Sequence, residues 1–399
     1  MDNIIENTSA TAVTSADTYR FTQMVAPYMR IEDTTIGRPG KDDYTIRFRG
    51  QLLIDSVEAY ERLQADFATL NHTPVFRKQG DRHVVLAHAG TWDVTPANPW
   101  VNLVLAVLTI ASVMWTGWSQ AQTYDNPWPI AISYTVALLG ILLAHEFGHY
   151  FAGQYHKAKV TLPYLIPLPG LIGTMGAVIL MRAPLKNRRV LLDVGIAGPL
   201  AGLVVAIPVV IVGLSLSQIS TIPMPPPNSD MVGILMEGNS LLYLFLKFVT
   251  FGQLLPAPSD YGAFGPVVYW ISYFFTGQPF PYGAADVTIH PLAWAGWVGL
   301  LITGLNLLPA GQFDGGHVAY VLLGKNVKYL RWVILALLIP AGFFWQGWWL
   351  WAALILFMNR GHATVLDEIT ELDGTRTLIA WGMIIVFLLV FTPVPLVVG

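Results

Sequence analysis

The chain contains no cysteine among its 399 residues. Disulfide bonds, thiolate metal ligands and a cysteine nucleophile are therefore excluded, and the redox compartment stays undecided. Charge is also scarce, since only 12% of the residues are Asp, Glu, Lys or Arg, against roughly 25% in soluble domains. The net charge is −3 and no run of Lys or Arg occurs. The sequence therefore predicts no nucleic-acid partner.

The shortage of charge is confined to one part of the chain. Residues 1–98 carry 23 charged side chains, whereas the 301 residues that follow carry 24. This later part contains repeated long apolar runs, and the mean hydropathy of the chain is +0.52. Because the N-terminus is acidic and polar, we expect no cleavable signal peptide. The sequence predicts a soluble N-terminal region fused to a polytopic α-helical membrane domain.

The N-terminal region divides into two predicted parts. Residues 1–43 are rich in Asp, Thr, Ser and Glu, so we expect an irregular N-terminal arm. Residues 44–98 are predicted to form a small cytosolic β-α-β-β domain of the α+β class. Its signals are an alternating strand, a helical stripe that begins after Asp55, and two strand-like runs around a Gln-Gly-Asp turn. We expect docking or regulation from this domain, because its residues suggest no chemistry.

The domain at residues 99–399 contains about seven apolar runs that are interpreted as membrane spans. They cover residues 100–118, 129–153, 190–215, 291–308, 330–345, 346–358 and 377–397. Eleven of the twelve Lys and Arg residues beyond position 98 fall on the side of the N-terminal domain, and only Lys247 falls opposite. The positive-inside bias therefore predicts that the N-terminal domain and the active-site side are cytosolic, and that the C-terminus is external.

Two apolar segments do not fit simple spans. Residues 160–182 contain six Pro and Gly residues, so we expect a hairpin that dips into the membrane and is shielded by protein. Residues 217–286 form a long external segment, to which the sequence assigns no role. Its apolar stretches 241–255 and 264–275 could lie on or dip into the outer leaflet. At the outer side, we expect Asp286 and His290 to cap the fourth span rather than to bind a ligand.

His145, Glu146 and His149 form a His-Glu-x-x-His motif near the cytosolic end of the second span. Residues i and i+4 share one face of a helix, so both imidazoles can bind one Zn²⁺. Glu146 can reach a water at the metal without being a ligand, which suits the general base of peptide hydrolysis. The alternative is a chance pattern. Metal binding is favoured because three ionisable groups within five residues of an apolar span are costly without a shared purpose.

A zinc hydrolase of this kind needs a third protein ligand and an open position for water. Asp314 is the best candidate, because it lies in a continuation of the fourth span where an unpaired carboxylate is costly. The alternative for Asp314 is a turn or a helix cap beside Gly315. His317 is an alternative ligand, although a polar role at the start of a helix is favoured for it. Asn306 could cap broken backbone, or it could hold the substrate or an oxyanion.

The pairing of HEFGH in one span with NLLPAGQFDGGH in a later one resembles the site-2 proteases, which are intramembrane zinc metalloproteases. The N-terminal β-α-β-β unit, the Pro/Gly hairpin and the segment GPLAG are most similar to the plastid, cyanobacterial and bacterial branch. This branch includes the chloroplast ethylene-dependent gravitropism-deficient proteins. The resemblance covers roughly residues 44–399, and the two metal motifs together are highly specific.

The resemblance implies one Zn²⁺ per chain and a role for each site residue. The implied ligands are His145, His149 and Asp314. Glu146 is implied to be the catalytic base, and Asn306 to lie beside the site. The hairpin around Gly173 and Gly176 is implied to present the substrate as an added strand.

The expected function is hydrolysis of a peptide bond in the transmembrane segment of a membrane protein substrate, as in regulated intramembrane proteolysis. The expected partners are this substrate, already cleaved once by another protease, the lipid bilayer, and a second copy of the chain in a homo-oligomer. The expected location is the plasma membrane of a bacterium or a plastid membrane of a plant. The alternatives are a catalytically silent scaffold of the same fold, which has no need of Glu146, and a metal-ion transporter, which often shows internal repeats that this sequence lacks.

Overall fold

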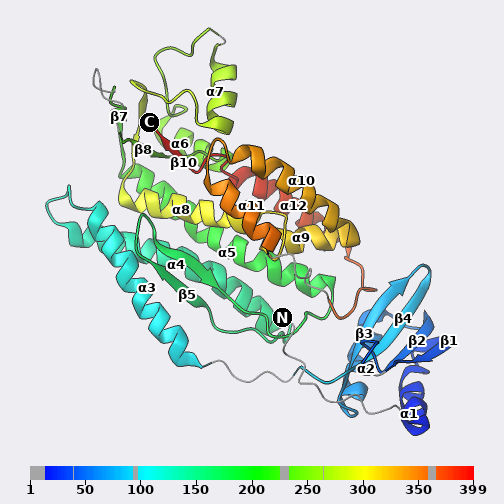
Figure 1. Ribbon diagram of the computed structural model, residues 1–399. Coiled ribbons are helices and arrows are strands. Elements are labelled where there is room, and N and C mark those ends of the chain that lie inside the picture. The colour runs from blue at the N-terminus through cyan, green and yellow to red at the C-terminus, as the bar shows by residue number, and fades with distance from the viewer. Residues whose placement is uncertain (1–13, 39, 93–97, 225–232, 264, 358–364) are drawn as a thin grey trace. The chain divides into compact units, whose positions relative to one another are not determined.

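The computed structural model describes residues 14–38, 40–92, 98–224, 233–263, 265–357 and 365–399 (Figure 1). It contains two compact units. The N-terminal unit comprises Met1–Pro96 together with the short segments Met181–Leu191 and Ala363–Arg376, and the helical unit comprises the rest of the chain. Each unit is described separately.

The N-terminal unit is built on a four-stranded antiparallel sheet. The strands β1 (Met29–Ile36), β2 (Ile46–Leu52), β3 (His72–Gln79) and β4 (Arg82–Ala89) have the order β1-β2-β4-β3. Helix α2 (Ser56–Ala68) follows β2, so the predicted β-α-β-β order is confirmed. The aromatic side chains of Phe48, Phe67 and Phe76 are fully buried in the core of this unit.

The prediction of an irregular arm over residues 1–43 is wrong for much of its described part. Residues Ser15–Val25 form helix α1, and Met29–Ile36 form β1 at the edge of the sheet. Thr14 and Asp17 make a reciprocal capping box that starts α1, and Phe21 is buried in the core. The buried apolar side chains of this region are few, namely Phe21, Val25 and Met29, so they give a weak periodic signal. Residues 1–13 and 39 lie outside the described residues.

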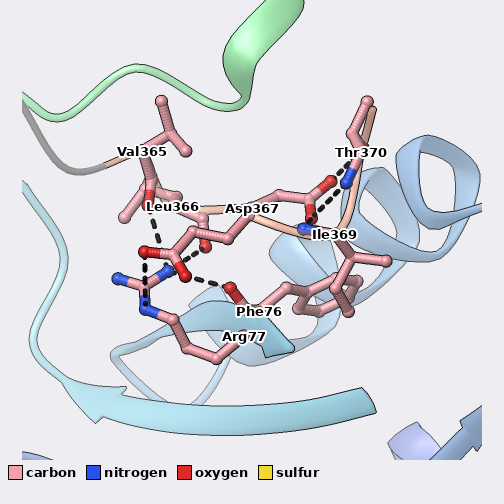
Figure 2. A network of polar contacts seen from close by, with 8 residues as sticks. Phe76, Arg77, Val365, Leu366, Asp367, Ile369 and Thr370 are labelled. Carbon is pink, nitrogen blue, oxygen red and sulfur yellow. Dashed lines mark hydrogen bonds and ion pairs between the residues drawn. The ribbon is translucent and has the colours of Figure 1, made fainter. Parts of the chain in front are cut away.

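Two segments from later in the chain, Met181–Leu191 and Ala363–Arg376, complete the N-terminal unit. The sequence did not indicate this contribution. The amide of Phe76 donates a 2.8 Å hydrogen bond to the carbonyl of Leu366, and the amide of Asp367 donates a 2.7 Å bond to the carbonyl of Lys186. The carboxylate of Asp367 is fully buried and accepts hydrogen bonds from the amides of Ile369 and Thr370 and from the Thr370 hydroxyl (Figure 2). Burial raises the pKa of Asp367, although these hydrogen bonds oppose the rise.

Arg77 strengthens this attachment from the end of β3. Its Nη1 atom donates hydrogen bonds to the carbonyls of Val365 and Leu366 at 3.0 and 3.1 Å. Its Nε atom lies 3.6 Å from a carboxylate oxygen of Glu368. The guanidinium group therefore supplies a donor to the Val365 carbonyl and a second donor to the Leu366 carbonyl, which already accepts from Phe76.

Three helices of the helical unit are long and apolar enough to cross a membrane, counted among the described residues. They are α3 (Pro99–Gln120), α4 (Pro127–Tyr155) and α5 (Arg188–Ser215). Asn98 and Asn126 cap α3 and α4, and a proline follows each cap at the first helical position. These helices agree with the first three predicted spans and make the chain a membrane protein.

The four remaining predicted spans each contain a shorter helix. These helices are α8 (Pro291–Asn306), α10 (Val327–Ala341), α11 (Gly347–Phe357) and α12 (Gly374–Val390). They have 16, 15, 11 and 17 residues, against about 20 for a typical span. Helix α9 (Asp314–Leu323) and a short 3₁₀ turn (Gly324–Asn326) connect α8 to α10. The number of seven spans therefore stays a prediction.

The Pro/Gly-rich segment forms the predicted hairpin. Strands β5 (Tyr164–Leu168) and β6 (Gly173–Val178) pair antiparallel. The Thr116 hydroxyl donates to the Gly170 carbonyl at 2.9 Å, which fastens the turn of the hairpin to α3. Gly173 has φ +91°, and a Cβ atom there would lie 2.7 Å from the Cα atom of Val113 in α3. Glycine is therefore required both for the backbone conformation and for the close approach to the helix.

The long segment 217–286 is folded where it is described. It contains β7 (Gln218–Thr221), β8 (Leu235–Glu237), α6 (Leu241–Phe251), α7 (Gly265–Thr276) and β9 (Ala285–Thr288). Strand β7 pairs with β9, and β8 pairs with β10 (Leu396–Val398) near the end of the chain marked C (Figure 1). As predicted, His290 caps α8, because its Nδ1 atom accepts a hydrogen bond from the amide of Leu292. The prediction that Asp286 also caps α8 is wrong, since its carboxylate faces Lys247.

Candidate metal centre

Helix α4 carries the His-Glu-x-x-His motif in a continuous stretch of 29 helical residues. His145 and His149 lie one turn apart, so their rings share one face of the helix. The side chains are buried, with exposed fractions of 4% for His145, 5% for Glu146 and 9% for His149. Burial of three ionisable residues in an apolar helix requires polar partners.

Asp314 is the first residue of α9, and its side chain lies beside those of His145 and His149. Helix α8 ends at Asn306, and the chain turns through Gly311, which has φ +60°, before α9 starts. Gly315 makes this tight turn sterically feasible, because a Cβ atom there would lie 1.9 Å from the carbonyl oxygen of Leu307. The turn separates Asp314 from the fourth predicted span and puts its carboxylate beside α4.

The three candidate ligands form a nearly equilateral triangle. The Nε2 atoms of His145 and His149 are 3.2 Å apart, and each lies 3.3 Å from Oδ2 of Asp314. A tetrahedral site with metal–ligand bonds of about 2.0–2.1 Å places its ligand atoms about 3.3 Å apart. Two imidazoles and one carboxylate are also ligand types that zinc accepts. The residues therefore fit a zinc ion in donor chemistry and in spacing, and they supply three of the four ligands of a tetrahedral site.

A backbone carbonyl of α5 orients one of the two imidazoles. Nδ1 of His149 lies 2.7 Å from the carbonyl oxygen of Val194, so this nitrogen carries the proton and donates it. The Nε2 atom is then unprotonated and free to bind a metal. Outer partners of this kind fix the tautomer and the ring direction of a metal-binding histidine.

Glycines of α5 provide the space for both rings. A Cβ atom at Gly198 would lie 2.1 Å from Nε2 of His149, and one at Gly202 would lie 3.3 Å from Cβ of His145. A glycine of α4 likewise makes room for α5, because a Cβ atom at Gly148 would lie 2.4 Å from the carbonyl oxygen of Ala197 in α5. The small residues therefore allow α5 to pack directly against the face of α4 that carries the motif.

The remaining predicted residues lie at different places. Nδ2 of Asn306 is 3.4 Å from Nε2 of His145, which puts the amide at the edge of the triangle. Glu146 directly follows His145 in α4 and is buried. His317 is buried, and its Cβ atom packs beneath Gly195 of α5. Gly173 and Gly176 belong to β6 of the hairpin.

The sequence indicated the three side chains that form the triangle but not the groups that support them. The carbonyl of Val194 has no signature in the sequence, because every residue has a carbonyl group. The glycines had a signal, since Gly198 and Gly202 are four residues apart and therefore share one face of α5. This spacing marks a close helix–helix contact, and here the contact lies at the metal site.

A helical membrane protein that joins a His-Glu-x-x-His helix to a distant aspartate has the architecture of a membrane metallopeptidase. The chain belongs to peptidase family M50, whose family model matches residues 133–343.

The chain is similar to several curated plant proteins. It is 30% identical over 271 residues to the probable zinc metalloprotease EGY1, chloroplastic, of Arabidopsis thaliana. The aligned region covers 66% of this chain and 43% of the relative. The chain is 29% identical to EGY1 of Oryza sativa subsp. japonica, over 67% of this chain and 41% of the relative. It is 25% identical to EGY3 of Oryza sativa subsp. indica, over 75% and 49%. The chain thus spans less than half the length of these relatives, and no solved structure matches it.

Proposed function

We propose that the chain is an intramembrane zinc metalloendopeptidase that hydrolyses a peptide bond within the transmembrane segment of a membrane protein. The observation that carries this proposal is the triangle of His145, His149 and Asp314, with Glu146 adjacent to it in a helix of membrane-spanning length. Family membership and the names of the plant relatives support the proposal.

The three side chains of the triangle hold one zinc ion in the proposed enzyme. When bound, the zinc supplies Lewis acidity, which lowers the pKa of a water molecule and polarises the carbonyl group of the peptide bond. Val194 keeps the ring of His149 in the tautomer that can bind the metal.

Glu146 moves the proton in the proposed reaction. Its carboxylate takes a proton from the attacking water and returns it to the nitrogen atom of the leaving amine. The amide of Asn306 donates a hydrogen bond to the carbonyl oxygen of the substrate, where negative charge develops. The distance of 3.4 Å between its Nδ2 atom and Nε2 of His145 supports this role.

The hairpin of β5 and β6 serves as the substrate edge in this proposal. A helical peptide bond is enclosed by its own hydrogen bonds, so cleavage requires that the substrate unwinds to an extended strand. Such a strand can pair with an exposed sheet edge. Apolar side chains of the hairpin, including Met175 at 66% exposure, are available to a transmembrane substrate. The hydrogen bonds from Thr116 and Tyr134 to the turn of the hairpin hold it in place.

The finer topology is part of the same proposal. The chain has seven spans, and the N-terminal unit and the active-site side face the cytosol, or the stroma in a plastid. The positive-inside bias of eleven cations against one supports this orientation. The relatives named above are chloroplastic proteins, which supports a plastid membrane over others. A substrate already shortened by another protease enters from the bilayer, and a homo-oligomer is the proposed assembly.

The test measures zinc content and peptide cleavage together, on detergent-purified wild type and on the variants Glu146→Gln and His145→Ala. We expect about one zinc per chain in wild type and in Glu146→Gln, with chelator-sensitive cleavage of a transmembrane peptide by wild type alone. His145→Ala is expected to lose both zinc and cleavage. Equal cleavage by wild type and Glu146→Gln would contradict the assigned role of Glu146, and absence of zinc from wild type would refute the mechanism.

A further inference from the structure

Helices α6 and α7 have the opposite polarity to helices that cover a water-soluble protein. Their tyrosines and the one lysine are buried, their large exposed side chains are apolar, and Thr250, Ser272 and Thr276 are half-buried. Lys247 is the single Asp, Glu, Lys or Arg residue in the two helices, and it is fully buried. The tyrosines Tyr243, Tyr269 and Tyr273 also point inward, with exposed fractions of 0%, 7% and 3%.

The buried side of α6 contributes to a cluster of charged groups. Nζ of Lys247 lies 3.7 Å from a carboxylate oxygen of Asp286 in β9 and 5.0 Å from the ring centre of Tyr243. The hydroxyl of Tyr243 donates a 3.0 Å hydrogen bond to Glu237 in β8. Glu237 and Asp286 are themselves buried, at 6% and 4% exposure. Lysine is stable in such a place only beside opposite charge, so the cluster fixes which face of α6 points inward.

The fully exposed positions of both helices are all apolar. Large side chains are exposed along both of them, by between 47% and 69%. They include Phe245, Phe248, Val249, Val267, Ile271 and Phe275. A helix that faces water carries its polar residues outside and its apolar stripe inside, and both helices reverse this order.

We propose that the outer faces of α6 and α7 contact the acyl chains of the lipid bilayer. Two observations favour lipid over a protein partner. The first is the complete absence of charge from these faces, since the one charged side chain has been turned inward to its own ion pair. The second is continuity of chemistry with the long helices, whose exposed side chains include Val104, Val136 and Val204 at 55%, 67% and 73%.

The lengths of the two helices limit how they lie in the bilayer. Helices of 11 and 12 residues are about 17 Å long at 1.5 Å per residue, whereas the hydrocarbon core is about 30 Å thick. Neither helix can cross it. The loop between them exposes Ser259 and Asp260, which belong in water. Both helices therefore occupy a single leaflet, at the end of the helical unit where α8 begins.

The experiment uses the absence of cysteine from the chain, which lets a single probe be introduced without background. The full-length variants Phe245→Cys and Ile271→Cys test the two outer faces, and Ser259→Cys is the control in the loop. Phe248→Cys and Val267→Cys are second sites on the same faces, in case either first variant fails to fold. Each variant is reconstituted in phosphatidylcholine vesicles and treated either with a membrane-impermeant maleimide or with an environment-sensitive fluorophore.

We expect the helix positions to react with the impermeant maleimide at least about tenfold more slowly than Ser259→Cys, because they lie in hydrocarbon. We also expect their fluorophores, and not the one at position 259, to be quenched by lipids that carry a nitroxide on the acyl chain. Rapid reaction without quenching would show that the faces lie in water and would overturn the proposal. Slow reaction without quenching would show that protein covers them, which would overturn it equally. The result does not depend on proteolytic activity.

Discussion

Gly198 gives the sharpest test of the metal site, because a single methyl group there should remove zinc without changing any ligand. In Gly198→Ala, the new Cβ atom would lie 2.1 Å from Nε2 of His149, whereas Cβ contacts below 3.0 Å essentially do not occur. The ring must therefore move by about 0.9 Å, and ligand distances in metal sites are held to within about 0.2 Å. We expect zinc affinity to fall about 100-fold or more, which corresponds to about 2.7 kcal/mol.

Two further glycines provide a graded comparison. Gly202→Ala would put a Cβ atom 3.3 Å from Cβ of His145, which requires a shift of only a few tenths of an ångström. Gly140→Ala adds a methyl group on α4 with nothing within 4 Å. We therefore expect zinc affinity to decrease in the order Gly140→Ala, Gly202→Ala, Gly198→Ala, with the first equal to wild type.

The assay is competition for zinc between each purified variant and a chelator of known affinity, followed by elemental analysis. Circular dichroism and gel filtration in detergent check that each variant is folded. If folded Gly198→Ala bound zinc as tightly as Gly140→Ala, the argument from the α4–α5 contact would be refuted.

The other predictions concern the third ligand, the hairpin and the segment around Asp367. Asp314→Ala should lose zinc by elemental analysis while the helix content stays unchanged, because the carboxylate supplies one of three ligand atoms; retention of tight zinc would exclude Asp314 as a ligand. Thr116→Val should destabilise the hairpin by about 1 kcal/mol, since the Gly170 carbonyl loses its donor, with faster hydrogen exchange at 168–173 and unchanged zinc content. Asp367→Ala should lower the free energy of hydrogen-exchange protection at the amides of residues 366–370 by about 2 kcal/mol, because two amides and a hydroxyl lose their acceptor. Burial raises the pKa of Asp367 above its unfolded value, so its protonation favours the folded state. Its contribution is therefore largest at low pH and declines as pH rises through the raised pKa, and this pH dependence of protection, corrected for intrinsic exchange, should disappear in Asp367→Asn.

The local patterns of the sequence were sufficient for the elements that carry the site. The spacing of His145 and His149 fixes their common helical face, and the cost of a lone carboxylate in an apolar stretch singled out Asp314. The hydrophobic alternation and the turn residues between 44 and 89 predicted the β-α-β-β order, which the structure has. These features depend on residues that are near one another in the chain.

The features that the sequence did not reveal depend on pairing between distant residues. Lys247 was interpreted as a cation of an external loop, but Asp286, far along the chain, makes its burial possible. In the same way, no local pattern links Asp367 to distant residues, yet its amide bonds to the carbonyl of Lys186, and the carbonyl of the neighbouring Leu366 accepts from Phe76 in β3. Charge and hydropathy alone do not distinguish a buried, paired ion from a solvated one.

The pairing of β7 with β9 has a consequence for how this family can vary. The two strands run antiparallel with Gln218 opposite Thr288, so the segment between them leaves and rejoins the helical unit at one point. The ends of α5 and α8 that flank the segment are thereby held together by the strands themselves. Insertions and deletions between β7 and β9 can then accumulate without changing the distance between these helices. Length changes in the loops of this segment therefore need not move Val194 on α5 or Asn306 on α8, which lie at the candidate metal site.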